Sequence, residues 1–283
     1  MKTLQFVDDV VFQTYHALYS PENIFLHFDW QQMLDNFHPH GKGCLVVLDD
    51  VPIGGIIVDD DYITAPFLIP PFMDQMLFWK TVGQLTEGIQ KLQYIPDTHS
   101  DILQKIGAKK VRSKYQMIRP TAHYDVNPKA GFFFDSIRES DKAEMADAIL
   151  KAHNHGYVGL TEGRLDICEV KQILEKRLKL FSETNTLGMG TVVREGSTNR
   201  IAAVCVAGIY PDVPNCFATI HQVAVLPEFR RRGLARSMIL RTIDTAAHTS
   251  PAVVLGVLKG NPAEVLYAQL GFRAGCAYSD YVL

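Results

Sequence analysis

Three consecutive arginines stand directly before two small residues, at a point where a strand is expected to give way to a helix. The stretch reads Val223-Ala224-Val225-Leu226-Pro227-Glu228-Phe229-Arg230-Arg231-Arg232-Gly233-Leu234-Ala235. A helix N-terminus exposes unpaired N–H groups and the positive end of the helix dipole. Small residues at 233 and 235 let an anion approach the backbone, and the arginines add fork-shaped donors. We therefore predict a site for a pyrophosphate or a similar polyanion.

Other known anion-binding loops do not match this stretch. It lacks the Gly-Lys-Ser/Thr of a P-loop and the G-x-G-x-x-G of a dinucleotide fold. Taken alone, the arginines are equally compatible with a solvated turn, and Gly233 with a simple glycine at a helix start.

A second motif follows the next apolar strand, expected over residues 252–258. Asn261 is suited to cap a helix and Pro262 to occupy its first position, while Gly271 marks its end. Apolar positions recur at the spacing of one helix face, at Ala263, Leu266, Tyr267 and Leu270.

In this order and at this spacing, the two motifs closely resemble the GCN5-related N-acetyltransferase (GNAT) superfamily. Arg230, Gly233 and Ala235 meet its [Q/R]-x-x-G-x-[G/A] signature, and the resemblance covers roughly residues 131–283. It implies an α/β fold with a mixed (α+β) sheet and acetyl-CoA as the co-substrate. By the same resemblance, the cofactor-binding residues are Val223, Ala224, Val225 and Asn261 for the pantetheine arm, and Arg230, Arg231, Arg232, Gly233, Leu234 and Ala235 for the phosphates.

Tyr267 is our candidate general acid, because of its place in the family pattern. When an amine attacks the thioester directly, the expelled thiolate can take a proton from a phenol at hydrogen-bond distance. The alternative is a purely structural role, since Tyr267 lies on the apolar face of its helix with Ala263, Leu266 and Leu270.

His221 is the candidate general base, on a strand expected over residues 216–226. Strict alternation would place it on one face with Thr219, Val223 and Val225, toward the same cleft. A reference pKa near 6.5 suits base work at neutral pH. A hydrogen-bonded core histidine remains an equal alternative.

The loop over residues 154–167 is expected to contribute to the acceptor site. Glu162 or Asp166 could hold an ammonium group there, although acids in loops are more often only solvated. His153-x-His155 and His38-x-His40 lack Cys or carboxylate partners at ligand spacing. We interpret both as surface loops and predict no metal site.

The length of 283 residues suggests two domains at about 150 residues each. We place them at residues 1–125 and 126–283, joined by the linker from Arg119-Pro120 to Asn127-Pro128. Leu103–Ala108 resembles Tyr267–Phe272 in sequence. The first part nevertheless has Leu103 where Tyr267 stands and Asp97 where Asn261 stands, and it has no Arg-x-x-Gly-x-Ala. We therefore expect a tandem GNAT protein with a degenerate N-terminal copy.

Composition excludes several classes of protein. The net charge of −3 gives no general case for nucleic-acid binding. The longest apolar run, Ile201–Tyr210, is far below the ~18 residues that span a bilayer. The N-terminus lacks the apolar region of a signal peptide. Five scattered cysteines suggest neither a disulfide framework nor a zinc ribbon, so we expect a cytoplasmic protein.

The predicted activity is acetyl transfer from acetyl-CoA to a primary amine, by direct attack in a ternary complex. The acceptor is a small-molecule or peptide amine, which the sequence does not identify; neither nucleic acid nor membrane is an expected partner, and a homodimer is left open. The alternative is a non-catalytic module that binds or senses acyl-CoA, which retention of Tyr267 and His221 disfavours.

Overall fold

The computed structural model describes residues 1–20, 41–209 and 217–283. His38, His40 and Cys216 lie outside these ranges. The chain divides into two compact units, residues 1–116 with 274–283, and residues 117–273. The division thus falls near the linker expected from the sequence, but the C-terminal segment groups with the first unit.

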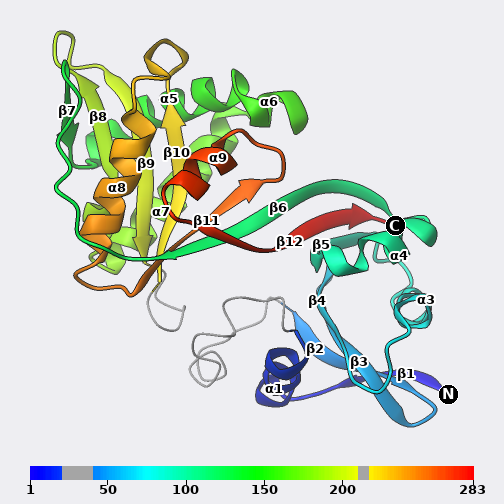
Figure 1. Cartoon of the computed structure of the whole chain (residues 1–283). Helices are drawn as coiled ribbons and strands as arrows, with labels where there is room; N and C mark the ends of the chain where they lie inside the picture. The colour runs from blue at the N-terminus through cyan, green and yellow to red at the C-terminus, as the bar shows by residue number, and fades with distance from the viewer. Residues whose placement is uncertain (21–40, 210–216) are drawn as a thin grey trace. The chain divides into compact units, whose positions relative to one another are not determined.

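The first unit is built on a mixed sheet (Figure 1). Its strands lie in the order β1-β2-β3-β4-β5-β12-β6, so that the last strand of the chain is inserted between β5 and β6. Neighbouring strands up to β4 are antiparallel, β4 and β5 are parallel, and β12 pairs antiparallel with β5. The elements are β1 (Lys2–Phe6), α1 (Asp9–Tyr19), β2 (Lys42–Leu48), β3 (Val51–Val58), β4 (Tyr62–Leu68), α3 (Gln75–Leu85), β5 (Lys91–Pro96), α4 (Ser100–Lys105), β6 (Lys109–Pro120) and β12 (Arg273–Val282).

The second unit has strands in the order β11-β10-β9-β8-β7. Only the β10–β11 pair is parallel among these strands of the described chain. The elements are β7 (Phe132–Asp135), α5 (Lys142–Asn154), α6 (Tyr157–Thr161), α7 (Ile167–Glu183), β8 (Thr191–Glu195), β9 (Ile201–Ile209), β10 (Ala218–Val225), α8 (Leu234–Ala246), β11 (Ala252–Leu258) and α9 (Ala263–Gln269). The short helix α6 lies where the sequence suggested only a loop.

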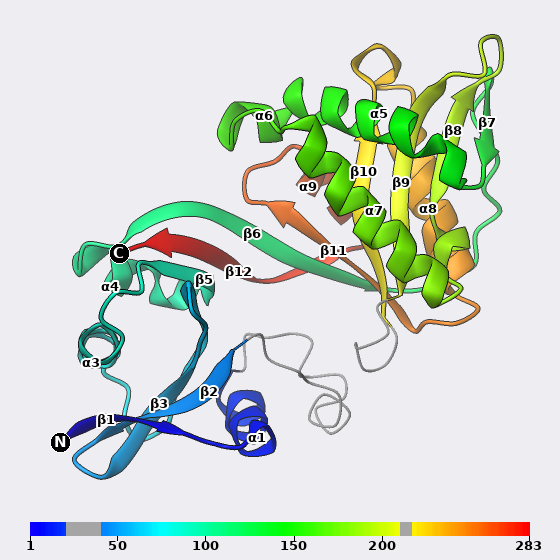
Figure 2. The same cartoon turned by 180° about the vertical axis from the view of Figure 1, so that it is seen from behind.

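Helices cover both faces of the second sheet. In Figures 1 and 2, α5 and α7 lie over one face, whereas α8 and α9 lie over the other. All nine residues of β9 are buried, which explains its uninterrupted apolar sequence. The helix predicted to follow Gly233 buries Leu234, Met238, Ile243 and Ala246, which recur at the spacing of one helix face.

The two units share a detailed helix ending. Gly107 and Gly271 both have positive φ, at 100° and 85°. Ala108 N–H donates to the Leu103 carbonyl at 2.9 Å, and Phe272 N–H donates to the Tyr267 carbonyl at 3.0 Å. The similarity between residues 103–108 and 267–272 is therefore one of backbone geometry as well as sequence.

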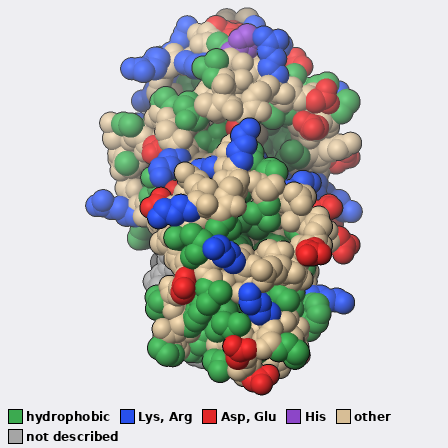
Figure 3. Space-filling model, turned by 90° about the vertical axis from the view of Figure 1, so that its right-hand side faces the viewer, with side chains coloured by type: hydrophobic (Ala, Val, Ile, Leu, Met, Phe, Trp, Pro, Cys, Tyr) green, Lys and Arg blue, Asp and Glu red, His purple; other side chains and the backbone are tan. Residues whose placement is uncertain are grey.

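No helix in the described part of the chain is both long and apolar enough to cross a bilayer. Basic and acidic side chains are interspersed on the face shown in Figure 3. This mixed surface agrees with the small net charge of −3.

Candidate functional site

The parallel strands β10 and β11 separate partway along their length. They pair only between Ala218–Ile220 and Val253–Leu255. Beyond this point a cavity of about 270 Å³ opens between them, lined by residues of both strands, including Val223, Ala224 and Val225 of β10 and Gly256, Val257 and Leu258 of β11. Strand edges that lack a partner present free backbone donors and acceptors. An extended ligand with amide groups can therefore bind between the strands.

A β-bulge lies at the point of separation. On β10, Ile220 faces Ala207 of β9 and Gln222 faces Val206, so His221 is the extra residue. The bulge interrupts the alternation assumed from the sequence. Val223 pairs with Cys205, whose thiol touches Thr242 of α8 at 3.5 Å, whereas His221 contacts α7. The prediction that Thr219, His221, Val223 and Val225 share one face is therefore wrong.

His221 is held by an arginine on α7. Arg177 Nε donates to His221 Nε2 over 3.2 Å. Burial, together with the nearby Arg177 charge, lowers the pKa of His221 to about 4. The imidazole is thus neutral at physiological pH and a weaker base than the reference value near 6.5 suggested.

Tyr267 lies in the cavity wall and is 8% exposed. Helix α9 places it there, and its ring packs against Phe272 with the centroids 6.0 Å apart. Burial, and to a lesser degree Cys205, raises the pKa of its phenol to about 12. The side chain therefore keeps its proton at neutral pH, as a general acid must.

Asn261 also lines the cavity, at the start of α9. Its Oδ1 accepts from the Ala263 N–H at 2.9 Å, so the predicted capping interaction is present although Pro262 occupies the cap position. With Oδ1 accepting from the backbone, the side-chain NH₂ supplies the donors that a ligand in this cavity could use.

Arg230 is engaged with the protein's own backbone. Its Nη2 donates to the Ala152 carbonyl at 2.7 Å, its Nη1 to the His155 carbonyl at 2.8 Å and its Nε to the Val225 carbonyl at 3.3 Å. The guanidinium thus closes the C-terminal end of α5, where a cation is favourable. It lines the cavity, but its primary contacts are structural.

The remaining residues of the arginine loop lie outside the cavity lining. Arg231 and Arg232 are exposed, Arg231 has a φ of 64°, and Arg232 lies over the Phe229 ring at 5.5 Å. Gly233, with a φ of 82°, precedes Leu234 and Ala235 in α8, and no side chain caps this helix. Lys129 Cε would be 3.2 Å from a Cβ at Gly233. Free N–H groups and these cations create an anion-favouring surface.

Two further cavity residues were not predicted as site residues from the sequence. His153, at the end of α5, lines the cavity beside Gln222, and burial with the Arg230 charge lowers its pKa. It is therefore no surface-loop residue, in contrast to the exposed His155. Tyr157 of α6 donates its hydroxyl to the Lys259 carbonyl at 3.0 Å. This bond ties α6 to the loop after β11.

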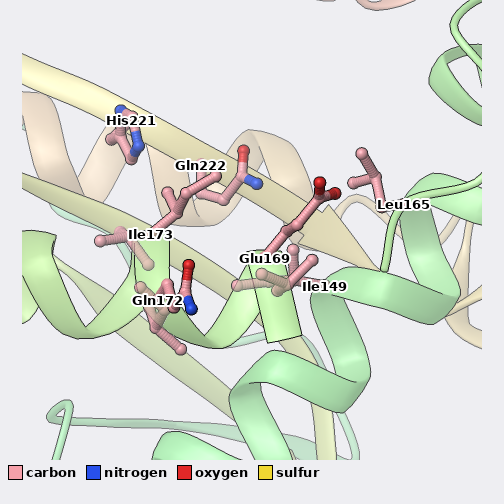
Figure 4. A pocket seen from close by; sticks show the side chains of 10 residues that line it. Ile149, Leu165, Glu169, Gln172, Ile173, His221 and Gln222 are labelled. Carbon is pink, nitrogen blue, oxygen red and sulfur yellow. The ribbon is translucent and has the colours of Figure 1, made fainter. Parts of the chain in front are cut away.

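A second cavity, of about 370 Å³, adjoins the bulge from the α7 side (Figure 4). It shares His221 and Gln222 with the first cavity. Its acidic residue is Glu169, not the predicted Glu162 or Asp166. Asp166 instead caps α7, with Oδ1 accepting from Cys168 N–H at 2.7 Å. Glu169 directly precedes the buried Val170 in the first turn of α7. Its position beside the cavity follows only once α7 is known to lie against β10.

In residues 1–20, 41–209 and 217–283, no group of three or more His, Cys, Asp or Glu side chains is arranged to hold a metal ion.

The geometry agrees with what comparisons with known proteins find. Residues 138–272 match the model of the acetyltransferase (GNAT) family. None of the curated proteins compared with the chain matches it.

Three solved structures resemble almost the whole chain. A GCN5-related N-acetyltransferase from Sphaerobacter thermophilus has a TM-score of 0.69 at 14% identity, covering 100% of this chain and 95% of that one. A tandem GNAT protein from the clavulanic acid biosynthesis pathway has a TM-score of 0.59 at 12% identity, covering 100% of this chain and 98% of that one. A GNAT-family acetyltransferase from Colwellia psychrerythraea has a TM-score of 0.60 at 12% identity, covering 99% of this chain and 98% of that one. At such identities the likeness concerns the fold, and the predicted tandem α/β arrangement is confirmed.

Proposed function

Because the chain is a member of the GNAT acetyltransferase superfamily through residues 138–272, we propose that it transfers an acetyl group from acetyl-CoA to a primary amine. The observation that carries this proposal is the separation of β10 and β11, with Tyr267 in the wall of the cavity between them. The reaction is direct: the amine nitrogen bonds to the thioester carbonyl carbon, and the carbon–sulfur bond then breaks.

The co-substrate would lie along the open strand edges. Backbone groups of Val223–Val225 are available to its pantetheine amides, and the amide of Asn261 stands at the other side of the cavity. The pyrophosphate would bind at the start of α8, where Gly233 leaves the backbone open and Arg231 and Lys129 supply positive charge. Arg230 supports this site indirectly by holding α5 against the end of β10.

Tyr267 would donate the proton that the departing thiolate takes up. A phenol with a pKa of about 12 is fully protonated at neutral pH, and its burial in the cavity wall keeps competing water away from it.

The amine must release a proton, but His221, the general base expected from the sequence, is poorly suited to accept it. His221 is neutral, but a pKa of about 4 and the hydrogen bond from Arg177 make it a poor proton acceptor. We propose that the ammonium loses one proton to water before attack, and that the nitrogen loses a second proton after attack, which returns through water to the Tyr267 phenolate. His221 then positions the acceptor at the bulge.

The test is thiol release from acetyl-CoA with a panel of primary amines, with the acetylated amine identified by mass spectrometry. Tyr267→Phe should lower kcat by about 100-fold, the lower end of the range for general acid catalysis, and leave the Kd for acetyl-CoA unchanged. Tyr62→Phe, on β4 of the first unit, is the matched control. Unchanged turnover in Tyr267→Phe would remove the assigned role.

The same assay separates the second candidate function, a sensor that binds acyl-CoA without turnover. The weak basicity of His221 is the observation that favours it. Tight acetyl-CoA binding by the native chain with no thiol release from any amine would establish the sensor and exclude the transferase.

A further inference from the structure

The cavity on the α7 side adjoins the cavity between β10 and β11. Its volume of about 370 Å³ lies between α7 and β10, and it meets the cavity between β10 and β11 at His221 and Gln222. A molecule bound here would therefore lie against His221 and Gln222 on the face of the sheet opposite to the helix that carries Tyr267, since α9 and α7 cover different faces (Figures 1 and 2).

The walls of this cavity are mostly apolar. Aliphatic side chains come from α5, the loop before α7, α7 itself and β9, namely Ile149, Leu165, Ile173 and Val206. Figure 4 shows Ile149, Leu165 and Ile173 of this set, together with the polar lining residues Glu169, Gln172, Gln222 and His221. Such a lining favours a ligand with a hydrocarbon body and very few polar atoms.

Few charged side chains line the cavity. Glu169 is its single acidic lining residue, and no lysine or arginine lines it. His221 is neutral because its pKa is lowered to about 4, and Arg177 is directed at His221 Nε2. Asp166 is used by the N-terminus of α7. The carboxylate of Glu169, an exposed residue at the edge of the cavity, is thus the acidic group available to an entering ammonium.

We propose that this cavity binds the acceptor, and that the acceptor is a primary amine carried on an aliphatic or aromatic body. This inference rests on the proposed function. Glu169 attracts the protonated amine, and the apolar walls hold its hydrocarbon part. An amine with a carboxylate beside it, such as an α-amino acid, should bind more weakly, because Glu169 repels the carboxylate and no lysine or arginine lines the cavity.

The first test measures binding without catalysis. Titration of n-hexylamine into the native chain should shift the methyl NMR signals of Ile149, Leu165, Ile173 and Val206. Glu169→Gln should weaken binding about ten-fold, the size of one hydrogen bond to a charged group. Glu183→Gln, an exposed acid at the other end of α7, is the matched control and should bind as the native chain does. Absence of these shifts, or equal affinity in Glu169→Gln, would overturn the proposal.

The second test concerns selectivity and access. With acetyl-CoA present, kcat/KM should rise with chain length from ethylamine to hexylamine, and 6-aminohexanoate and leucine should be poorer than hexylamine by at least ten-fold. Ile173→Trp, at a position 52% exposed, fills the cavity without disturbing the core. It should abolish transfer while the affinity for acetyl-CoA is retained. Transfer that is faster to the anionic amines, or unaffected by Ile173→Trp, would refute the assigned substrate class.

The two tests also separate this inference from the proposed function. Hexylamine binding that depends on Glu169, with no acetyl transfer, would contradict the transferase and support the cavity assignment. Acetyl transfer that is unchanged by Glu169→Gln and Ile173→Trp would support the transferase and contradict the cavity assignment.

Discussion

Arg177 Nε donates a hydrogen bond to His221 Nε2 at 3.2 Å, which joins the middle of α7 to the bulge in β10. Since Nε2 acts as the acceptor, the neutral imidazole carries its proton on Nδ1. The bond and the positive charge both oppose protonation of the ring. The hydrogen bond from Arg177 therefore suits His221 to positioning a ligand and not to accepting a proton.

Replacing Arg177 by methionine should raise the pKa of His221 above its native value of about 4, though not to the reference value, because burial remains the largest cause of the shift. The measurement is an NMR titration of the His221 ring proton. Lys176→Met, a change of the neighbouring exposed residue, is the control. An unaltered titration in Arg177→Met would show that the arginine does not act on the ring.

The pKa of His221 measured in this titration can be compared with the pH dependence of kcat/KM. If His221 were the base, the acid limb of the kcat/KM profile would follow its pKa and move upward in Arg177→Met. We expect the limb to stay in place, because the amine loses its proton to water. His221→Ala should then raise KM for the amine without a shift in the profile.

Arg230 and Arg231 should differ sharply when replaced, although they are neighbours in one motif. Arg230→Leu removes three hydrogen bonds to backbone carbonyls and should lower the free energy of unfolding by about 2–4 kcal/mol. Arg231→Leu should leave stability within about 0.5 kcal/mol and weaken acetyl-CoA binding instead. Urea denaturation and calorimetric titration measure the two effects. Equal losses of stability would contradict this division of roles.

The sequence predicted the elements of the second unit well where packing and propensity agree. The strand expected over residues 252–258 has the observed bounds, and the apolar run Ile201–Tyr210 contains β9, because a strand covered on both faces must be continuously apolar. The helix containing Tyr267 was predictable from its start at Asn261, its periodicity and its end at Gly271.

The sequence could not predict contacts that depend on one irregular residue or on distant backbone. Alternation along β10 is a sound rule until a bulge adds a residue, and no residue type at position 221 signals it. Arg230 matches a phosphate motif, but two of the carbonyls that it binds, those of Ala152 and His155 at the C-terminal end of α5, lie more than 70 positions earlier. Glu169 becomes a site residue only when α7 is placed against β10.

Two buried histidines in the first unit should make stability fall on acidification. Burial lowers the pKa of His16 and of His99 to about 4, from 6.5 in the unfolded chain. Between these values the unfolded state binds more protons, so stability rises with pH across this window and is lost as the pH falls from 6.5 toward 4. Each histidine contributes a slope of about 1.4 kcal/mol per pH unit.

His99→Gln isolates one of these contributions, because a glutamine oxygen can still accept the hydrogen bond that Trp79 Nε1 donates to His99 Nδ1 at 3.1 Å. Urea unfolding followed by tryptophan fluorescence at pH 7 and pH 5 should give a shallower dependence in this variant. The carboxylates titrate alike in both proteins, so only the difference is assigned to His99. Identical slopes would show that His99 is not the source.

Gly260 and Tyr157 should be coupled across the mouth of the first cavity. Gly260 has a φ of 88°, and a Cβ there would lie 2.8 Å from the Tyr157 hydroxyl oxygen. Gly260→Ala therefore combines about 1–2 kcal/mol of backbone strain with a clash that displaces the hydroxyl from the Lys259 carbonyl. Gly163→Ala, at the same φ of 88° but with nothing within 4 Å, should show the strain alone.

The coupling is measured by a double-mutant cycle with Tyr157→Phe, using urea midpoints and the Kd for acetyl-CoA. In the Tyr157→Phe background the clash is absent, so Gly260→Ala should cost no more than Gly163→Ala does. Both Gly260→Ala and Tyr157→Phe should weaken acetyl-CoA binding, because each releases α6 from the loop that borders the cavity. Strictly additive free energies would mean that the hydroxyl yields freely and that this contact does not hold α6 over the site.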